Sequence, residues 1–283
     1  MDLKAVNAYI EKVERSEKKV LSSAKGKLKV GVDLGTAYIV IVVLDEKDHP
    51  VACEKRAARV LRDGVVVDFM GAQQIVGELK ATLESRIGRE LTQCAIAMPA
   101  GTESSTKTHI YVAESAGFEV IRVLDEPSAA NALYRISNGV IVDIGGGTTG
   151  LAVFRDGDVM RVVDEATGGV HLTLVLSGNM GVPFEEAERI KMDRSNHKKI
   201  FPIIKPVVEK MASIVRNHID TNETEVLYLC GGTCCMTGIE KVFQAQVGIP
   251  VILPSNPFLV TPIGIAMNCF AEQNQTESST VTS

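Results

Sequence analysis

One pattern occurs twice in the sequence, once in each half of the chain. Residues 28–43 and 139–154 both read as an apolar strand that ends in Val-Asp-(Leu/Ile)-Gly, a turn with Gly and Thr, and a second apolar strand. A repeat of this kind predicts two similar halves that face each other. The two acids at the strand ends, Asp33 and Asp143, would then lie close together.

The turn that follows Asp143 contains three consecutive glycines, in the segment VDIGGGTTG (142–150). Glycine permits positive φ angles and a close approach of the backbone to another group. The segment therefore has two interpretations: a tight turn between strands, or a loop whose N–H groups and threonine hydroxyls hold an anion. One glycine-rich loop does not decide between them. The repeat favours the second interpretation, because two acid-tipped hairpins could close around a single phosphate chain.

The composition narrows the class of protein. Hydrophobic residues make up 45% of the chain, enough for a sizeable core, and the net charge is −5. This charge argues against a nucleic acid or an anionic membrane as the main partner. The charged N-terminal segment lacks the apolar stretch of a signal peptide, and no apolar run elsewhere is long enough to span a membrane. We therefore expect a soluble, cytoplasmic protein.

The six cysteines show no second pair at the spacing of a metal site. Free thiols are expected in a reducing compartment. Oxidation of the adjacent Cys234 and Cys235 is an alternative that the sequence leaves open.

Strands alternate with helices along the chain, which predicts an α/β architecture. Residues 3–20 have a charged helical pattern with a narrow apolar stripe. The sequence leaves open whether this helix docks on the body of the protein, stays solvated or serves as a tag for a partner. We expect an N-terminal helix at 1–26, a first half at 27–138, a second half at 139–271 and a disordered polar tail at 272–283.

Five segments share a family's motifs and their order. They are GVDLGTA (31–37), LDEPSAANALY (124–134), VDIGGGTTG (142–150), CGGTCCMTGIEKVF (230–243) and NPFLVTPIGIAM (256–267). The chain thereby resembles the nucleotide-binding core of the actin, hexokinase and 70-kDa heat-shock ATPases, from about residue 28 to residue 270. Within that superfamily it is most similar to an ethanolamine-utilization family, in the segments RDGVVVDFMGA, LDEPSAA, VVDEATGG and FEEAERIK. The resemblance implies an actin-like ATPase fold: two duplicated ribonuclease-H-like halves around a nucleotide cleft, with reduced outer subdomains.

The resemblance also implies roles for individual residues around ATP or ADP and Mg²⁺. Asp33, Glu126 and Asp143 would be the catalytic acids, and Asp33 and Asp143 would hold the Mg²⁺ through water. The nucleotide-binding residues would be Gly35, Thr36, Ala37, Gly145, Gly146, Gly147, Thr148, Gly168, Gly169, Glu188, Lys191, Gly231, Gly232 and Thr233. Such a set suits phosphoryl transfer, which mainly needs positioning and charge neutralisation.

Simpler interpretations of four of these positions remain open. Glu126 could cap a helix, Asp33 could brace its own turn, and Glu188 with Lys191 could form a solvated helix face. We also find no match for the catalytic lysine of the heat-shock ATPases, and Phe258-Leu259 replaces their acidic pair. Binding of nucleotide with slow hydrolysis is therefore the expectation.

The function that the resemblance implies is an ATP-binding, chaperone-like accessory protein of ethanolamine utilization, whose cleft closure is read by a partner enzyme. Its partners would be nucleotide and a protein client of that pathway, in the cytoplasm or at a bacterial microcompartment. One alternative is an actin-like filament former or scaffold, which would self-associate. A small-molecule kinase of the same superfamily is the third hypothesis.

Overall fold

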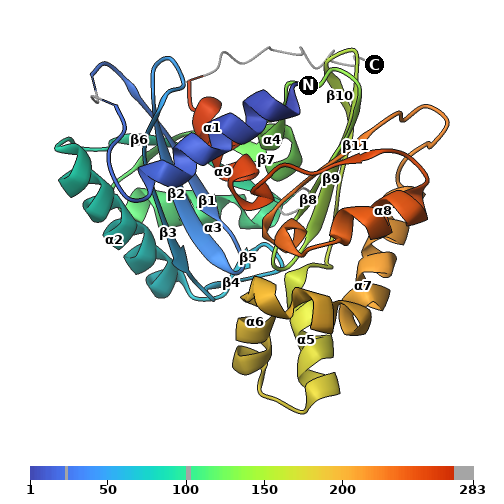
Figure 1. The fold of residues 1–283 in the computed structure, drawn as a ribbon. Helices are drawn as coiled ribbons and strands as arrows, with labels where there is room; N and C mark the ends of the chain where they lie inside the picture. Colours follow the sequence, from blue (N-terminus) through green and yellow to red (C-terminus); the bar gives the residue numbers. More distant parts are fainter. Residues whose placement is uncertain (23–24, 100–102, 271–283) are drawn as a thin grey trace, which may run out of the picture.

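Two five-stranded sheets, each the core of one half of the chain, form the centre of the molecule (Figure 1). The computed structural model describes residues 1–22, 25–99 and 103–270. The tail expected to be disordered lies outside the described residues, so that expectation stays a prediction. None of the helices in the described ranges is both long enough and apolar enough to cross a bilayer.

The first sheet has the strand order β3-β2-β1-β6-β7. Its strands are β1 (Leu28–Leu34), β2 (Tyr38–Asp45), β3 (Pro50–Ala57), β6 (Gln93–Met98) and β7 (Glu119–Asp125). The first three strands form an antiparallel meander, and β6 and β7 continue the sheet parallel to β1. A short hairpin, β4 (Leu61–Arg62) with β5 (Val65–Val66), lies beside it.

The second sheet repeats this topology with the order β10-β9-β8-β11-β12. Its strands are β8 (Gly139–Ile144), β9 (Thr149–Arg155), β10 (Asp158–Glu165), β11 (Leu227–Cys230) and β12 (Val251–Ile252). Again three antiparallel strands are followed by two that run parallel to the first. The two sheets therefore confirm the duplicated α/β architecture that the sequence repeat predicted.

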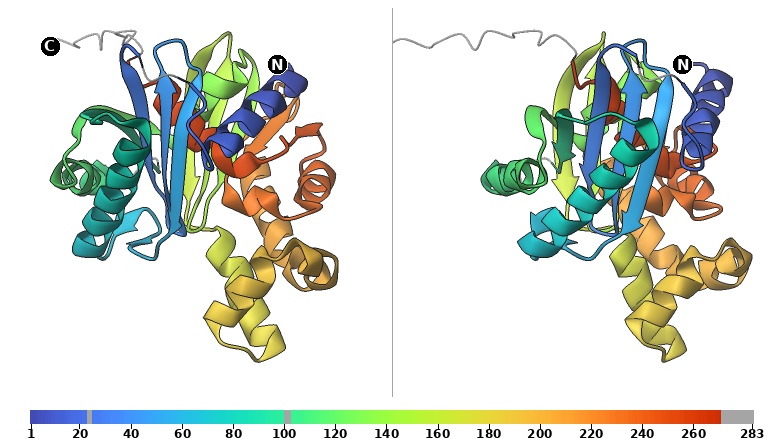
Figure 2. Two further views of the ribbon diagram at one scale, coloured as in Figure 1. Left: turned by 60° about the vertical axis from the view of Figure 1, so that its left-hand side comes forward. Right: turned by 90° about the vertical axis from the view of Figure 1, so that its left-hand side faces the viewer.

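The helices form a layer between the sheets and layers outside them. They are α1 (Leu3–Ser16), α2 (Phe69–Ile87), α3 (Glu103–Ser115), α4 (Glu126–Tyr134), α5 (Gly169–Met180), α6 (Phe184–Met192), α7 (His197–Asn217), α8 (Ile239–Val247) and α9 (Val260–Met267). Short 3₁₀ turns occur at Arg194–Asn196, Gly232–Cys235 and Pro257–Leu259. Figure 2 shows α2 and α3 outside the first sheet, and α5 and α6 projecting as a separate lobe.

The helices α4 and α9 lie between the two sheets, where α4 packs on β8 and β9, and α9 packs on β1 and β2 (Figure 2). Each helix therefore covers the sheet of the other half. The two helices touch closely at Gly264, where a Cβ atom would come within 2.0 Å of the Ala129 carbonyl oxygen. Because only glycine lacks that atom, the crossing depends on this residue.

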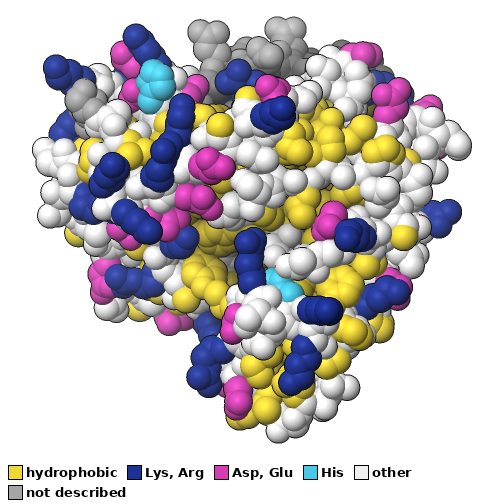
Figure 3. All heavy atoms as spheres, in the orientation of Figure 1, with side chains coloured by type: hydrophobic (Ala, Val, Ile, Leu, Met, Phe, Trp, Pro, Cys, Tyr) yellow, Lys and Arg dark blue, Asp and Glu magenta, His cyan; other side chains and the backbone are white. Residues whose placement is uncertain are grey.

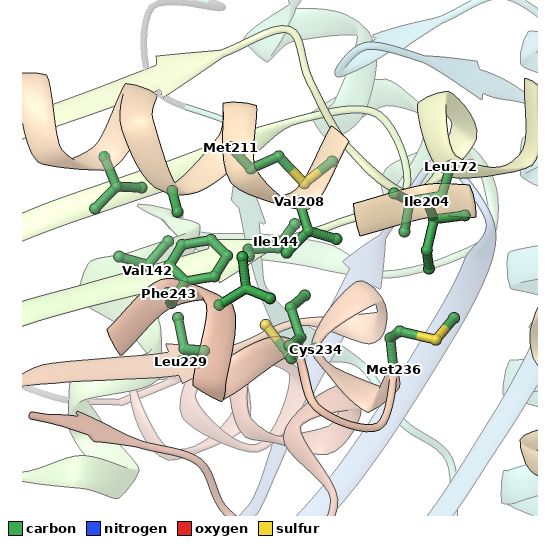
Figure 4. Packing of buried hydrophobic residues seen from close by; sticks show 14 of the residues in the cluster. Val142, Ile144, Leu172, Ile204, Val208, Met211, Leu229, Cys234, Met236 and Phe243 are labelled. Carbon is green, nitrogen blue, oxygen red and sulfur yellow. The ribbon is translucent and has the colours of Figure 1, made fainter. Parts of the chain in front are cut away.

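The second half has a continuous apolar core between its sheet and the helices α7 and α8 (Figure 4). Val142, Ile144 and Leu229 come from the sheet, and Met211 and Phe243 come from the helices. All five side chains are almost completely buried. This packing holds the strand β8 in place, and the turn that follows β8 enters the candidate site.

The N-terminal helix is docked. Val6, Ile10 and Val13, at a helical spacing, are buried in a core cluster together with Val40 and Val42 of β2. The helix α1 ends at Ser16, four residues before the end of the helical pattern in the sequence. The helix α2 begins at Phe69, because the side chain of Asp68 caps its first turn. Docking was left open by the sequence, since an apolar stripe does not identify the surface that covers it.

Candidate functional site

A cavity of about 540 Å³ lies between the two halves. It is lined by side chains and turns from both sheets and from the α5–α6 lobe. All but one of the residues with a role implied by the sequence line it: Asp33, Gly35, Thr36, Ala37, Glu126, Asp143, Gly145, Gly146, Gly147, Thr148, Gly169, Glu188, Lys191, Gly231, Gly232 and Thr233.

The exception is Gly168, which lies behind the second glycine turn. A Cβ atom at this position would come within 2.7 Å of the carbonyl oxygen of Gly146 and of the carbonyl carbon of Gly147. The next residue, Gly169, does reach the cavity, and its N–H donates to the Gly145 carbonyl over 3.0 Å. Gly168 therefore supports the turn rather than the cavity wall.

Three carboxylates converge on the cavity from three elements. Asp33 and Asp143 lie in equivalent positions near the ends of β1 and β8, and Glu126 is the first residue of α4. The cap of α4 is Asp125, whose side chain accepts from the Ser128 N–H over 2.8 Å. Glu126 is thus not the helix cap, and the described residues give Asp33 no hydrogen bond to its own turn.

The pKa values of all three carboxyl groups are raised. Burial and the neighbouring Asp143 raise the pKa of Asp33 to about 7. Burial, followed by the charges of Asp143 and Asp33, raises the pKa of Glu126 well above its usual range. Burial also raises the pKa of Asp143, against an opposing hydrogen bond from the Thr261 hydroxyl. Such a cluster of buried acids favours either protons or a cation in its centre.

The donor set suits a hydrated Mg²⁺ better than a directly bound metal. Among residues 1–22, 25–99 and 103–270, no three His, Cys, Asp or Glu side chains are close enough to hold an ion together. Mg²⁺ usually keeps several waters and takes only one or two carboxylates from the protein. Asp33 and Asp143 would therefore hold the ion through water.

The two glycine turns present free donors to the cavity. The Gly35 N–H donates to the Tyr38 carbonyl and the Gly145 N–H to the Thr148 carbonyl, both over 3.0 Å, and these bonds close the turns. In the described part of the chain, the N–H groups at the turn tips have no hydrogen-bond partner; these are Thr36, Ala37, Gly146 and Gly147. Adjacent unpaired N–H groups in a turn are a typical anion site.

The turn tips also face each other closely. A Cβ atom on Gly146 would lie 3.2 Å from the Ala37 Cβ, and one on Gly147 would lie 2.9 Å from the Thr36 hydroxyl. The donors of the two halves are therefore aimed at one region, as the repeat in the sequence predicted.

The third glycine turn forms the far wall of the cavity. Gly231 has φ +92°, and a Cβ atom there would come within 2.3 Å of the Asp143 carboxylate and 2.4 Å of the Ile144 carbonyl. Thr233 donates its hydroxyl proton to the Gly145 carbonyl over 2.7 Å. The second and third turns are thus joined directly, and glycine is required at 231 for both its backbone angle and its space.

Glu188 and Lys191 form a partly buried ion pair on α6. The Lys191 ammonium donates to Glu188 over 2.7 Å, to the Thr173 hydroxyl over 2.8 Å and to the Gly169 carbonyl over 3.0 Å. The side chains are only 20% and 14% exposed, respectively. The alternative of a solvated helix face is therefore wrong, and the pair ties α6 to the start of α5.

Sequence reasoning missed several residues of the site. Thr261, the second residue of α9, donates a hydrogen bond to Asp143. Tyr38 and Phe258 form an edge-to-face ring pair with centroids 5.4 Å apart at the cavity wall. Asp164, on β10, does not line the cavity, but its charge helps to raise the pKa of Glu126, and one of its carboxylate oxygens is buried with no hydrogen-bond partner in the described residues. Thr261, Phe258 and Asp164 lie in segments that carry the family resemblance, but no local pattern gave them a role, because each meets its partners only through tertiary packing.

Comparison with known proteins agrees with this geometry. The chain is 45% identical over 238 residues to the ethanolamine utilization protein EutJ of Salmonella typhimurium, and the match covers 84% of each chain. The chain belongs to the EutJ family. The crystal structure of the EutJ protein from Carboxydothermus hydrogenoformans, at 43% identity, superposes with a TM-score of 0.88 over 94% of this chain and 99% of that one.

Wider comparisons place the EutJ family among actin-like proteins. The family model described as MreB/Mbl protein matches residues 53–200, and the model described as cell division protein FtsA matches residues 140–267. The structure of MreB5 of Spiroplasma citri bound to ADP superposes with a TM-score of 0.68 over 86% of this chain and 96% of that one, at 18% identity. The fold is therefore the actin-like ATPase fold that the resemblance implied.

Proposed function

We propose that the cavity binds ATP or ADP with Mg²⁺ and that the chain is a chaperone-like accessory protein of ethanolamine utilization. The observation that carries the proposal is the pairing of unpartnered N–H groups at two opposed turns with buried acids between them. Phosphate oxygens would accept from the N–H groups, while Mg²⁺ would neutralise the acids and the phosphates together.

The protein side of hydrolysis would depend on the three acids. Asp33 and Asp143 would accept hydrogen bonds from metal-bound water, and Glu126 would hold or take up a proton from the attacking water. Lys55 lines the same cavity, but its ammonium donates to Glu17 over 2.7 Å. A cation already held in this way is a poor partner for developing phosphate charge, so we infer slow hydrolysis.

Contacts across the cleft would carry the nucleotide state to a partner. Arg59 of the first half forms an ion pair with Glu185 of α6 over 2.8 Å, and its guanidinium lies over the Phe184 ring. The Tyr38 hydroxyl lies 3.7 Å from the Met192 sulfur. Opening the cleft would break these contacts, and a partner enzyme of the pathway could detect that change.

Calorimetric titration with ATP, in the presence and absence of Mg²⁺, tests the proposal. The native protein should bind, and Asp143→Asn should lose the Mg²⁺ dependence and weaken by at least about tenfold, because one acid of the water shell is gone. Asp158→Asn, an exposed acid on β10, is the matched control and should bind like the native protein. Absence of binding by the native protein at millimolar ATP or ADP would refute the nucleotide site.

The match to the MreB/Mbl family model favours one alternative function, an actin-like filament former or scaffold. Light scattering and pelleting with ATP and Mg²⁺ distinguish the two. Scattering that rises above a critical protein concentration would support filaments, whereas a constant monomer signal would exclude them.

A further inference from the structure

A second hollow, of about 730 Å³, lies between α7 and α8 on the second half. We call it the α7–α8 groove. It shares two wall residues, Arg194 and His197, with the candidate nucleotide cavity, but none of the glycine turns at 35–37, 145–148 and 231–233 lines it. Figure 3 shows Lys and Arg side chains over the lobe that carries α7, with hydrophobic side chains between them.

The rim of the α7–α8 groove is positively charged. It carries four exposed cations, Arg194, Lys198, Lys205 and Lys241. Lys205 is paired with Glu209 over 3.2 Å, whereas no ion-pair partner of Lys198 or Lys241 occurs within the described ranges. The chain as a whole has a net charge of −5, so the positive charge of this rim is opposite in sign to the net charge of the chain.

The floor of the groove is apolar. The Phe201 ring packs over Gly238, 3.7 Å from the position of a Cβ atom there, and Val242 and Ala245 continue the floor along α8. Pro202 is exposed at the edge. Because the prolines at 202 and 206 lack an N–H, the carbonyls of residues 198 and 202 lack the usual donor four residues later in α7.

His197 joins the groove to the cavity. Its Nδ1 lies 3.1 Å from the Thr237 N–H, which can only donate, and its Nε2 lies 3.0 Å from the Lys191 carbonyl, which can only accept. The ring therefore carries its proton on Nε2. Thr237 lines the groove and Lys191 lines the cavity, so one neutral imidazole connects both walls.

We propose that the α7–α8 groove docks an acidic, amphipathic helical segment of a partner protein. Apolar side chains on one face of the segment would cover Phe201, Val242 and Ala245, and its carboxylates would pair with Lys198 and Lys241. An apolar floor with cations on the rim suits such a peptide better than a nucleic acid, whose phosphates would leave the floor uncovered. The proposal does not depend on nucleotide binding.

The test uses a synthetic, fluorescently labelled peptide of about 15 residues, long enough to form a helix when bound, with Leu on one face and Glu on the other. Fluorescence anisotropy should show binding at low salt that weakens as salt rises. The double variant Lys198→Glu/Lys241→Glu should weaken binding by at least about tenfold. A peptide with Lys in place of Glu should not bind.

The matched control is Lys199→Glu/Lys210→Glu, which makes the same change of charge at exposed positions of α7 outside the groove. It should bind the acidic peptide within about threefold of the native protein, and both double variants should keep the native thermal unfolding midpoint. Equal weakening by the two variants, or absence of binding at about 1 mM peptide, would overturn the proposal. Binding of single-stranded DNA as strong as that of the peptide would also overturn it. So would self-association of the native protein that only Lys198→Glu/Lys241→Glu abolishes, because the groove would then bind a second copy of the chain.

Discussion

Thr261 donates a hydrogen bond to the Asp143 carboxylate, although the two residues lie 118 positions apart. Thr261 is at the start of α9, and Asp143 is near the end of β8, so the bond fixes a helix between the sheets against the central acid of the cavity. The bond also lowers the pKa of Asp143, against the effect of burial. Thr261 is thus a positioning residue for the charged form of this carboxylate.

Replacing Thr261 by Val should weaken Mg²⁺-dependent ATP binding. Valine keeps the shape but removes the donor, and a hydrogen bond to a charged group contributes about 1.5–3 kcal/mol. Calorimetry should show a loss of affinity of at least about tenfold. Thr261→Ser keeps the hydroxyl and should bind nearly as the native protein does; equal affinities for the Val and Ser variants would contradict this role.

Replacing Gly231 by Ala should destabilise the folded protein by about 2–4 kcal/mol. The alanine would have to adopt a positive φ, and the packed atoms around it would have to shift. The new Cβ would meet the Asp143 carboxylate and the Ile144 carbonyl. Urea unfolding monitored by circular dichroism measures the change.

Gly248→Ala is the control for this substitution, because Gly248 has a similar φ of +84° but open space where its Cβ would lie. It should cost only about 1 kcal/mol, the cost of a left-handed backbone without a close contact. If the two variants lose the same stability, the close contact with Asp143 has no energetic consequence.

The sequence predicted the parts of the site that local signals encode. The two hairpins have an alternation of apolar strand, acid and glycine that is readable within about sixteen residues. Asp33, Asp143 and the turn tips therefore lie where the repeat placed them. The duplicated topology followed for the same reason, since each half repeats the same order of strands.

The remaining parts could not be read locally. Thr261 reaches the site through the packing of α9, and Asp164 comes near its acids through the packing of β10; no spacing in the sequence relates either residue to Asp143. Gly168 has the same local context as Gly169, but only the fold shows that it lies behind the turn. The docking of α1 depends equally on a surface that residues distant in sequence create.

The stability of the nucleotide-free protein should fall as the pH rises from about 4 to 7, and Asp164 should contribute to this fall. Burial, with the nearby charge of Asp143, raises the pKa of Asp164 to about 7 in the folded state, against about 3.9 in the unfolded chain. A raised folded pKa stabilises the fold below the unfolded value, and that contribution is lost as the pH passes 7.

Asp164→Asn removes this ionisation. At pH 8 its free energy of unfolding should exceed that of the native protein by about 1–3 kcal/mol, measured as a higher thermal unfolding midpoint. The difference should shrink towards pH 4. Asp158→Asn, on the same strand but exposed, should leave the pH profile unchanged. A native-like profile for Asp164→Asn would show that this carboxyl does not titrate near 7.

Replacing Ile10 by Ala should destabilise the protein by about 2–4 kcal/mol, because its side chain is fully buried beneath α1 and leaves a cavity when truncated. The helix also joins the two halves: Asn7 accepts from the Ser255 N–H over 2.8 Å, and Glu14 accepts from the Asn256 amide over 2.6 Å. Glu11→Ala, at an exposed position of the same helix, should change stability by less than about 0.5 kcal/mol. Urea unfolding of both variants measures the difference. Equal stabilities would mean that α1 is a loosely held segment, available to a partner, whereas the expected loss makes it part of the folded core that holds the cleft together.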